Sequence, residues 1–311
     1  MKDFLKFTLA TVTGIILSSI VLFIISMVTL FGIMSASDTE TIVKKNSVMM
    51  LDLNGTLVER TQEDPLGILS QLFGDESNTY GLDDILSSIQ KAKENENIKG
   101  IYLQASSLGT SYASLQEIRN ALLDFKESGK FVIAYADSYT QGLYYLSSAA
   151  DKVLLNPKGM IEWRGIASAP LFYKDLLQKI GVEMQVFKVG TYKSAVEPYI
   201  TTQMSEANRK QTASYLNSIW ETIISDIAEE RQIEKHILND YADSLVSLQE
   251  PQWVQKTKLV DSLLYRPEVE SFLTQLCGVE NINDINWASP TDIVSTAKKI
   301  KSKDRIAIVY A

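Results

Sequence analysis

An uncharged stretch over residues 7–37 constrains this chain more than any other feature of its sequence. Its core, FTLATVTGIILSSIVLFIISMVTLFGIM, consists mainly of Ile, Leu, Val and Phe, and a membrane-spanning helix needs about 20 such residues. A cleavable signal peptide has an apolar core of only about 7–15 residues, and SAS at 35–37 is a poor cleavage site after so long a run. We therefore predict one uncleaved transmembrane helix over residues 7–34.

The charges on either side of this segment indicate its orientation. Lys2, Lys6 and the terminal amine precede it, and Lys44 and Lys45 follow it. The lysines are balanced, so only the amine favours a cytoplasmic N-terminus under the positive-inside rule. We expect residues 1–6 in the cytoplasm, a polar linker over 35–46, and the remaining chain on the other side of a single-pass anchor.

The composition excludes several classes of function. A net charge of −8 and a pI near 4.9 argue against a nucleic-acid partner, which requires a basic face. The single cysteine, Cys277, excludes an internal disulfide and a cysteine-rich metal site. The single histidine, His236, lies in a charged stretch of helical character, where a solvated helix position explains it. A hydrolytic site in this chain therefore needs another base, and lysine is the obvious candidate.

Strand-like and helix-like segments alternate after residue 46, which is typical of parallel β-α-β units in an α/β domain. We expect the first strand to end in an Asn-Gly turn at Asn54 and Gly55. Strands are predicted over 47–58, 98–104, 130–137, 152–155 and 183–189, and helices over 82–95, 113–129, 140–151, 169–182 and 205–231, the last of them capped by Ser205.

The end of the sequence is similar to the beginning of the part that follows the membrane segment. KKIKSKDRIAIVYA and TIVKKNSVMMLDLNG share lysines, a polar joint and an apolar strand. This similarity indicates an internal repeat whose second copy is cut off. We expect a first repeat over residues 47–302 and the first strand of a second over 303–311.

A phosphatase-like motif is the least favoured of the functional alternatives. DLNGTL at 52–57 is similar to the opening motif of phosphatases and dehalogenases, in which an Asp at a strand end is the nucleophile. Asp52 could fill that role, but the second acid is replaced by Asn54, which cannot donate a proton. A Mg²⁺-dependent phosphatase using Asp52 is therefore only a third hypothesis.

Lys193, in VFKVGTYKSAVEPYI (186–200), is the better catalytic candidate. An ordinary lysine has a pKa of about 10.4, so a lysine that acts as a base must be desolvated to become neutral. We expect an inward-facing lysine in a packed turn formed by Gly190, with Tyr192 as a wall and Ser194 as a hydroxyl partner.

The lysine segment resembles the long form of bacterial signal peptide peptidase A, or protease IV, in its N-terminal repeat. YTQGLYYLSSAADKVLLNPKG, IKGIYLQ and the anchor follow the family's order. The resemblance implies a crotonase-like fold of the ClpP and enoyl-CoA hydratase type, a superhelix of ββα units. It also implies a serine peptidase with a Ser-Lys dyad and no metal or cofactor. The first repeat would supply the base, Lys193, and the second the serine.

Two departures mark the first repeat as degenerate under this resemblance. Gln141 in TQGLYY stands at the serine position, and SSLGTS has one glycine, Gly109, where the family has an oxyanion turn. The missing serine would follow Ala311. The nearby hydroxyls are better explained as caps or packed side chains; they belong to Ser138, Ser147, Ser148 and Ser194.

The resulting hypothesis is a membrane-anchored serine endopeptidase of the bacterial inner membrane that degrades cleaved signal peptides. The resemblance implies extended apolar peptides as substrates, an extracytoplasmic soluble part and a homo-oligomer; residues 7–34 would contact lipid. The alternative is a non-catalytic membrane scaffold or peptide-binding protein of the same fold, which the absent serine favours.

Overall fold

The computed structural model describes residues 1–36, 42–61 and 78–296, which fall into two units. The first unit comprises residues 1–43 and 291–311, and its main element is helix α1, Lys2–Ala36. Within the described residues, Lys2–Thr29 is the one helical stretch long and apolar enough to cross a membrane, with a mean hydropathy of 2.4. The expected apolar helix is therefore present, and it begins five residues earlier than the predicted 7–34.

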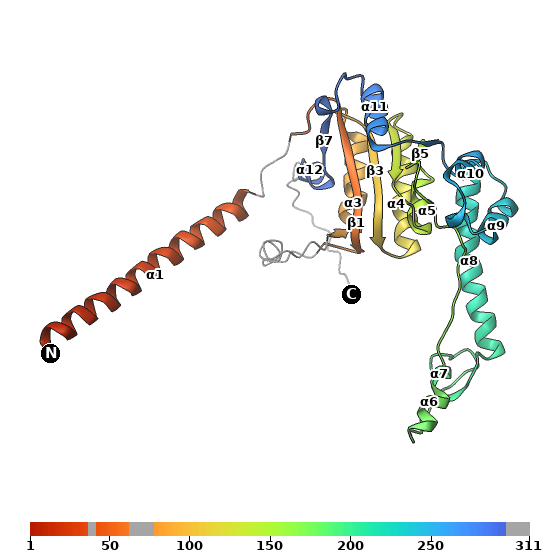
Figure 1. The fold of residues 1–311 in the computed structure, drawn as a ribbon, viewed down its shortest axis with the longest axis horizontal. Helices are drawn as coiled ribbons and strands as arrows, with labels where there is room; N and C mark the ends of the chain where they lie inside the picture. The colour runs from red at the N-terminus through yellow and green to blue at the C-terminus, as the bar shows by residue number, and fades with distance from the viewer. Residues whose placement is uncertain (37–41, 62–77, 297–311) are drawn as a thin grey trace, which may run out of the picture. The chain divides into compact units, whose positions relative to one another are not determined.

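The second unit, residues 44–290, is built on a parallel sheet (Figure 1). Seven strands of the described chain pair in the order β2-β1-β3-β4-β5-β6, with β7 also paired to β1. Every pairing is parallel, which confirms the predicted α/β class. The strands are β1 (Ser47–Val58), β2 (Thr79–Gly81), β3 (Ile98–Gly109), β4 (Phe131–Ala136), β5 (Lys152–Leu155), β6 (Ser262–Leu263) and β7 (Asn286–Ala288).

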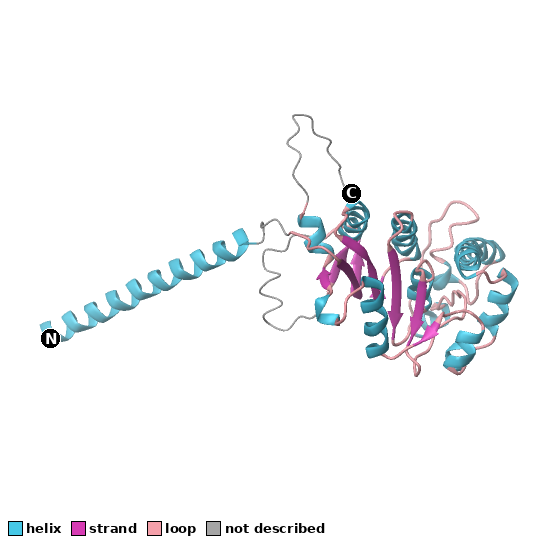
Figure 2. Cartoon of the chain, turned by 90° about the horizontal axis from the view of Figure 1, so that it is seen from above, coloured by secondary structure: helices cyan, strands magenta, loops and turns pink. Residues whose placement is uncertain are grey.

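Helices connect and cover the strands on both sides (Figure 2). Five residues of β4 are buried in succession, as expected for a strand covered on both faces. The helices of this unit are α3 (Leu82–Glu94), α4 (Tyr112–Lys126), α5 (Gln141–Ser147), α6 (Lys174–Lys179), α7 (Glu197–Ile200), α8 (Glu206–Arg231), α9 (Lys235–Asp243), α10 (Pro251–Lys256) and α11 (Arg266–Cys277), with short helices Val246–Leu248 and Ile282–Asp284; α12 is Pro290–Ser295.

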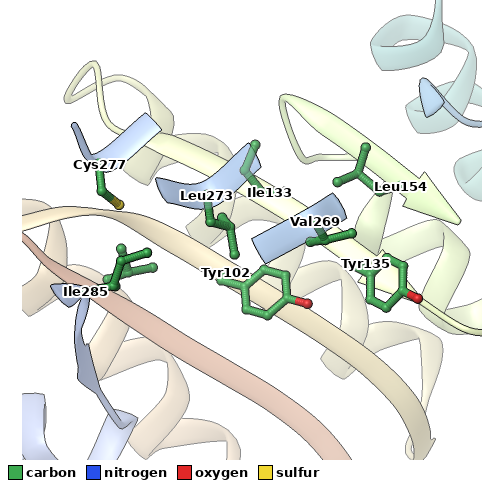
Figure 3. Close-up of a cluster of buried hydrophobic side chains, with 9 residues drawn as sticks. Tyr102, Ile133, Tyr135, Leu154, Val269, Leu273, Cys277 and Ile285 are labelled. Carbon is green, nitrogen blue, oxygen red and sulfur yellow. The ribbon is translucent and has the colours of Figure 1, made fainter. Parts of the chain in front are cut away.

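Helix α11 covers one face of the sheet through a cluster of buried apolar side chains (Figure 3). Val269 and Leu273 of α11 meet Tyr102 of β3 and Tyr135 of β4 in this cluster. Residues alternate between the two faces of a strand, and Leu103, next to Tyr102, is also fully buried. The core therefore occupies both sides of the central strands.

The order β1-β2-α3 forms a ββα unit of the kind expected for a crotonase-like domain. Between β4 and α5, Tyr139 forms an isolated parallel bridge with Ile161, outside the named strands. Tyr139 donates its backbone N–H to Met160 at 2.9 Å, and Glu162 donates its N–H back to Tyr139 at 2.8 Å. This bridge ties the chain that enters α5 to the segment that follows β5.

The predicted Asn-Gly turn is wrong, because β1 continues through Asn54 and Gly55 to Val58. A register shift against β3 falls between Leu53 and Asn54, so the irregularity is a bulge within the strand. Gly55 has φ 142°, and a Cβ there would lie 2.1 Å from the backbone oxygen of Asn78. Glycine is needed here for the close approach of two backbones and not for a chain reversal.

The predicted strand over 183–189 is also wrong, since this segment contains no strand. The position beside β5 is taken by β6, which comes from much later in the sequence. Phe187 and Val189 remain 93% and 90% exposed. The helix expected over 169–182 is confined to α6, whereas β3 extends beyond 98–104 to Gly109. The proposed repeat strand at 303–311 lies outside the described residues.

Candidate functional site

The lysine-bearing segment precedes helix α8 and is hydrogen-bonded to the start of that helix. The N-terminus of α8 is fixed by Ser205, whose Oγ accepts the N–H of Asn208 at 3.2 Å, as predicted from the sequence. Toward its other end Ile223 and Ile227 are buried, whereas much of its first half is exposed. In Figure 1, α8 extends away from the sheet, and α6 and α7 lie near its N-terminal end.

Lys193 lies in a tight turn that precedes α7. Gly190 has φ 100°, a conformation that residues with a side chain rarely adopt, so the turn depends on glycine here. Lys193 donates its backbone N–H to the oxygen of Gly190 at 3.4 Å, and Ser194 donates to Tyr192 at 3.1 Å. The predicted turn is present, and Gly190 has the role expected of it.

The environment of Lys193 differs from the packed one that we expected. Lys193 is exposed, Tyr192 is 54% exposed and Ser194 is half-buried. The turn faces the exposed side of α8 across an open cleft of about 1020 Å³. This cleft is lined by Gly190, Thr191, Tyr192, Lys193, Lys210, Gln211, Ser214, Tyr215, Ser218 and Ile219. The residues that the structure describes therefore do not remove Lys193 from water.

Gln141, at the position where the resemblance implies a serine, is a buried structural residue. It begins α5, and only 6% of it is exposed. Its Oε1 accepts the backbone N–H groups of Arg164 and Gly165 at 2.9 and 3.0 Å. Its Nε2 donates to the Tyr112 hydroxyl at 2.9 Å and to the Gly165 oxygen at 3.1 Å. All the polar atoms of the amide thus have partners, and the side chain fastens the 164–165 segment to α4 and α5.

Gln141 and Lys193 line different clefts. The cleft beside Gln141 has a volume of about 500 Å³ and contains no residue of the Lys193 cleft. It is formed by Tyr112, Thr140, Gln141, Gly142, Glu162, Arg164, Gly165, Ile166 and Ala167. The geometry does not bring the two predicted site residues together within one pocket.

Gly109 does not form a turn that requires glycine. It ends β3, where it pairs with Thr56 of β1, and Ser111 then caps α4 through the N–H of Ser114. A Cβ on Gly109 would lie 3.7 Å from the oxygen of Gly55 and from Oγ1 of Thr56, which is ordinary van der Waals contact. The stretch that the resemblance matched to a degenerate oxyanion turn is therefore a strand end in this chain.

Of the local serines, Ser147 and Ser148 are packed, as the sequence indicated, whereas Ser138 is neither packed nor a helix cap. Ser148 is buried and donates from Oγ to the Tyr145 oxygen at 2.7 Å, and Ser147 is also buried. Ser138 is exposed and donates to the oxygen of Asp137 at 2.8 Å. His236 is exposed on α9 beside Glu234, in agreement with a solvated helix position. Burial raises the pKa of the Cys277 thiol, which disfavours the reactive thiolate.

The phosphatase alternative lacks the strand-end nucleophile that it requires. Asp52 lies in the middle of β1, opposite Gln104 of β3, and the strand continues for six residues beyond it. In the part of the chain that the structure describes, no group of three or more His, Cys, Asp or Glu residues is arranged to hold a metal ion. This geometry gives no support to Mg²⁺-dependent chemistry at Asp52.

A buried carboxylate close to Lys193 was not identified as functional from the sequence. Glu197 begins α7 and is 3% exposed. Ser205 donates to it from both its N–H (3.1 Å) and its Oγ, and Asn208 donates from Nδ2 at 2.9 Å. The spacing of a glutamate eight residues before a helix cap gives no signal of this contact, which depends on the folding of the intervening turn.

Comparison with known proteins assigns the family. The model of peptidase family S49 matches residues 124–280, which include both Gln141 and Lys193. The chain belongs to peptidase family S49. Its resemblance to signal peptide peptidase A is thereby confirmed at the level of the family, and the predicted parallel α/β domain is the fold that carries both residues.

Three curated relatives place this S49 chain more closely. It is 38% identical to Protease 4 of Salmonella typhi over 74% of its own length and 39% of that protein. It is 31% identical to Protease 4 of Haemophilus influenzae over 82% and 43%. A putative signal peptide peptidase SppA of Enterococcus faecium is 22% identical over 85% of this chain and 76% of that protein. The chain thus spans about two fifths of the length of the two Protease 4 relatives.

Proposed function

We propose that this S49 chain is the lysine-bearing part of a membrane-anchored serine peptidase that degrades cleaved signal peptides through a Ser-Lys dyad. The observation that carries the proposal is the position of Lys193. This residue lies on a glycine-dependent turn, at an open cleft, within the segment matched by the peptidase family. The serine would come from sequence outside residues 1–311, since Gln141 occupies the corresponding position in this repeat.

In this mechanism the neutral amine of Lys193 accepts the proton of the serine hydroxyl while the serine oxygen attacks the peptide carbonyl. The lysine then returns the proton to the leaving amine and afterwards removes a proton from the water that hydrolyses the acyl-enzyme. Backbone N–H groups near the serine would stabilise the oxyanion. Closure of the cleft by the region that carries the serine would desolvate the lysine and favour its neutral form.

Helix α1 supports the membrane-anchored part of the proposal. Its uncharged length suits a single span, and the flanking charges favour a catalytic part outside the bacterial cytoplasmic membrane. A peptidase anchored there would act beside the bilayer, where cleaved signal peptides are released. Signal peptides as substrates agree with the name of the Enterococcus faecium relative, a putative signal peptide peptidase.

Homo-oligomerisation is the second part of the proposal. Several large apolar side chains in α6 and in the segments on either side of it, up to the Lys193 turn, are exposed, which is unusual for a surface that faces only water. They are Leu171, Leu176, Ile180, Phe187 and Val189. A second subunit that covers them would also help to close the lysine cleft.

The test uses the complete natural protein, purified in detergent, and a fluorogenic apolar peptide. Lys193→Ala should lower kcat/KM by about 10²–10⁴-fold, the usual contribution of a general base. Lys193→Arg should lose as much activity, because arginine keeps the positive charge but stays protonated. Lys179→Ala, a similar exposed lysine of α6, is the matched control and should retain activity.

Two outcomes would contradict the proposal. Full activity of Lys193→Arg would mean that the lysine contributes charge and not proton transfer. Absence of hydrolysis by the unsubstituted protein, together with retained binding of the peptide, would favour the non-catalytic scaffold. The saturated amide of Gln141 is the observation in favour of that alternative.

A further inference from the structure

Glu197 connects the Lys193 turn to the beginning of α8. Its carboxylate receives hydrogen bonds from two residues of the helix start: Ser205, which is the N-cap, and Asn208, three residues later. Ser205 uses the same hydroxyl to cap the N–H of Asn208. The carboxylate and the helix cap therefore form one network of hydrogen bonds at the end of the 26-residue helix.

The backbone of Glu197 is fixed as firmly as its side chain. Its N–H donates to the oxygen of Ser194 at 2.9 Å, and its oxygen accepts the N–H of Thr201 at 2.9 Å and the Thr201 hydroxyl at 3.0 Å. Ser194 is the residue after Lys193. The chain from Lys193 to Ser205 is thus held at both ends and in the middle, with Glu197 in all three sets of contacts.

The charge state of Glu197 suits this role. Burial alone would raise its pKa, but the hydrogen bonds from Ser205 and Asn208 outweigh burial and hold the pKa below its ordinary value. A carboxylate at a helix N-terminus is also stabilised by the helix dipole. Both carboxylate oxygens accept hydrogen bonds from these donors, which favours the ionised form of the group.

Glu197 does not act on Lys193 through a direct ion pair. Among the described residues, the charged pairs within 4.0 Å do not include Glu197 with Lys193. Its effect on the lysine must therefore pass through the turn. Because Lys193 is exposed, contacts of its own side chain do not hold it in place, and the backbone of the turn determines where the amine lies.

We propose that Glu197 is the positioning residue of the lysine base. By fastening the turn to α8, it sets the location at which the Lys193 amine meets the serine hydroxyl. This inference rests on the proposed Ser-Lys mechanism. Displacement of a catalytic group by about 1 Å can lower a rate about 10²-fold, so a rigid attachment of the turn has a direct effect on catalysis.

Three substitutions in the complete protein distinguish an effect on the position of Lys193 from an effect of the negative charge at residue 197. Glu197→Gln keeps the shape and can keep the network, because its Oε1 accepts from Ser205 and Asn208 while its Nε2 donates to the Ser205 hydroxyl. Glu197→Ala removes every side-chain contact. Glu206→Ala removes an exposed carboxylate from the same helix start and is the matched control.

We expect Glu197→Ala to lower kcat about 10²-fold with KM changed less than about threefold. Glu197→Gln and Glu206→Ala should stay within about threefold of the unsubstituted protein in kcat. If Glu197→Ala does not fold, Asn208→Ala replaces it, since it removes one of the donors and should lower kcat by about threefold to tenfold. A melting temperature for each variant identifies losses that come from unfolding.

Hydrogen exchange of peptides covering residues 190–200 gives a readout that does not depend on catalysis. Faster exchange there in Glu197→Ala, but not in Glu197→Gln, is expected. The inference is overturned by unchanged exchange, by full kcat in Glu197→Ala, or by equal losses in the Gln and Ala variants. If Lys193→Ala is inactive while Glu197→Ala is fully active, this inference alone fails. If neither the unsubstituted protein nor any variant hydrolyses peptide but exchange responds as expected, the proposed enzyme function is refuted. The attachment of the Lys193 turn to α8 by Glu197 is then supported, but its role in catalysis is refuted.

Discussion

The amide of Gln141 should contribute substantially to stability, although the proposed function assigns this position to the serine that this chain lacks. Replacing Gln141 with alanine leaves the N–H groups of Arg164 and Gly165 without their acceptor. It also removes the donor to the oxygen of Gly165 and to the hydroxyl of Tyr112. The side chain is almost fully buried, so these partners lose well-shielded hydrogen bonds.

The expected magnitude follows from these four contacts. A hydrogen bond contributes about 0.5–1.5 kcal/mol net, and buried groups left without a partner cost more. The neighbouring cleft is open, so water can reach some of the groups that lose their partner. We therefore expect Gln141→Ala to lower the free energy of unfolding by about 2–4 kcal/mol. For a unit of this size, the melting temperature should fall by about 4–16 °C.

Chemical denaturation in detergent, followed by tryptophan fluorescence, measures this change. Gln90→Ala is the matched control, because Gln90 is exposed and bonds only Glu94 one helical turn away; it should change stability by less than about 0.5 kcal/mol. A Gln141→Ala protein as stable as the Gln90→Ala protein would refute the reasoning. Gln141→Ser should be about as unstable as the alanine variant and gain no hydrolytic activity, since Lys193 lines another cleft.

Further predictions concern backbone contacts and acid. Gly159→Ala should destabilise the protein by more than about 2 kcal/mol in denaturation, because its Cβ would lie 2.1 Å from the oxygen of Asp137. Gly109→Ala should change the free energy of unfolding by less than about 1 kcal/mol, since the added Cβ would lie 3.7 Å from its neighbours. The lowered pKa of Glu197 means that its contribution is present above the ordinary value, about 4.3, and is lost as the pH falls through the folded value. Hydrogen exchange of residues 190–200, corrected for intrinsic rates, should therefore be constant from pH 7 to 5 and rise in stronger acid.

Local patterns were sufficient for the elements whose own spacing determines their structure. Helix α3 and the long helix α8 follow from apolar periodicity and, for α8, from a serine cap. The buried strands β1 and β4 follow from continuous apolar runs. Parallel pairing then follows from their alternation with helices. These parts of the fold depend on sequence neighbours and could be predicted from them.

Pairing between distant segments could not be predicted in the same way. The edge of the sheet beside β5 accepts Ser262–Leu263, which has only two residues and no strand pattern of its own. The apolar segment 183–189 has a stronger strand pattern but does not join the sheet. Asn54 and Gly55 have the composition of a turn, but pairing with Ser107 and Leu108 of β3 keeps them in an extended strand. In each case a partner far along the chain decides the outcome.

The same distinction between local patterns and contacts of distant residues applies to the candidate site. The turn at Gly190 was predictable because it needs only the backbone freedom of glycine. The exposure of Lys193 was not, because burial depends on which surfaces meet the turn. The contacts of Glu197 could not be predicted from the sequence either, since its partners belong to the start of the next helix. If Lys193 is the base, its position is set by contacts that this chain makes, and its desolvation must come from a surface that residues 42–61 and 78–296 do not supply. Position and reactivity of the lysine would then have separate structural origins, and substitutions at Glu197 and at the covering surface should affect kcat independently.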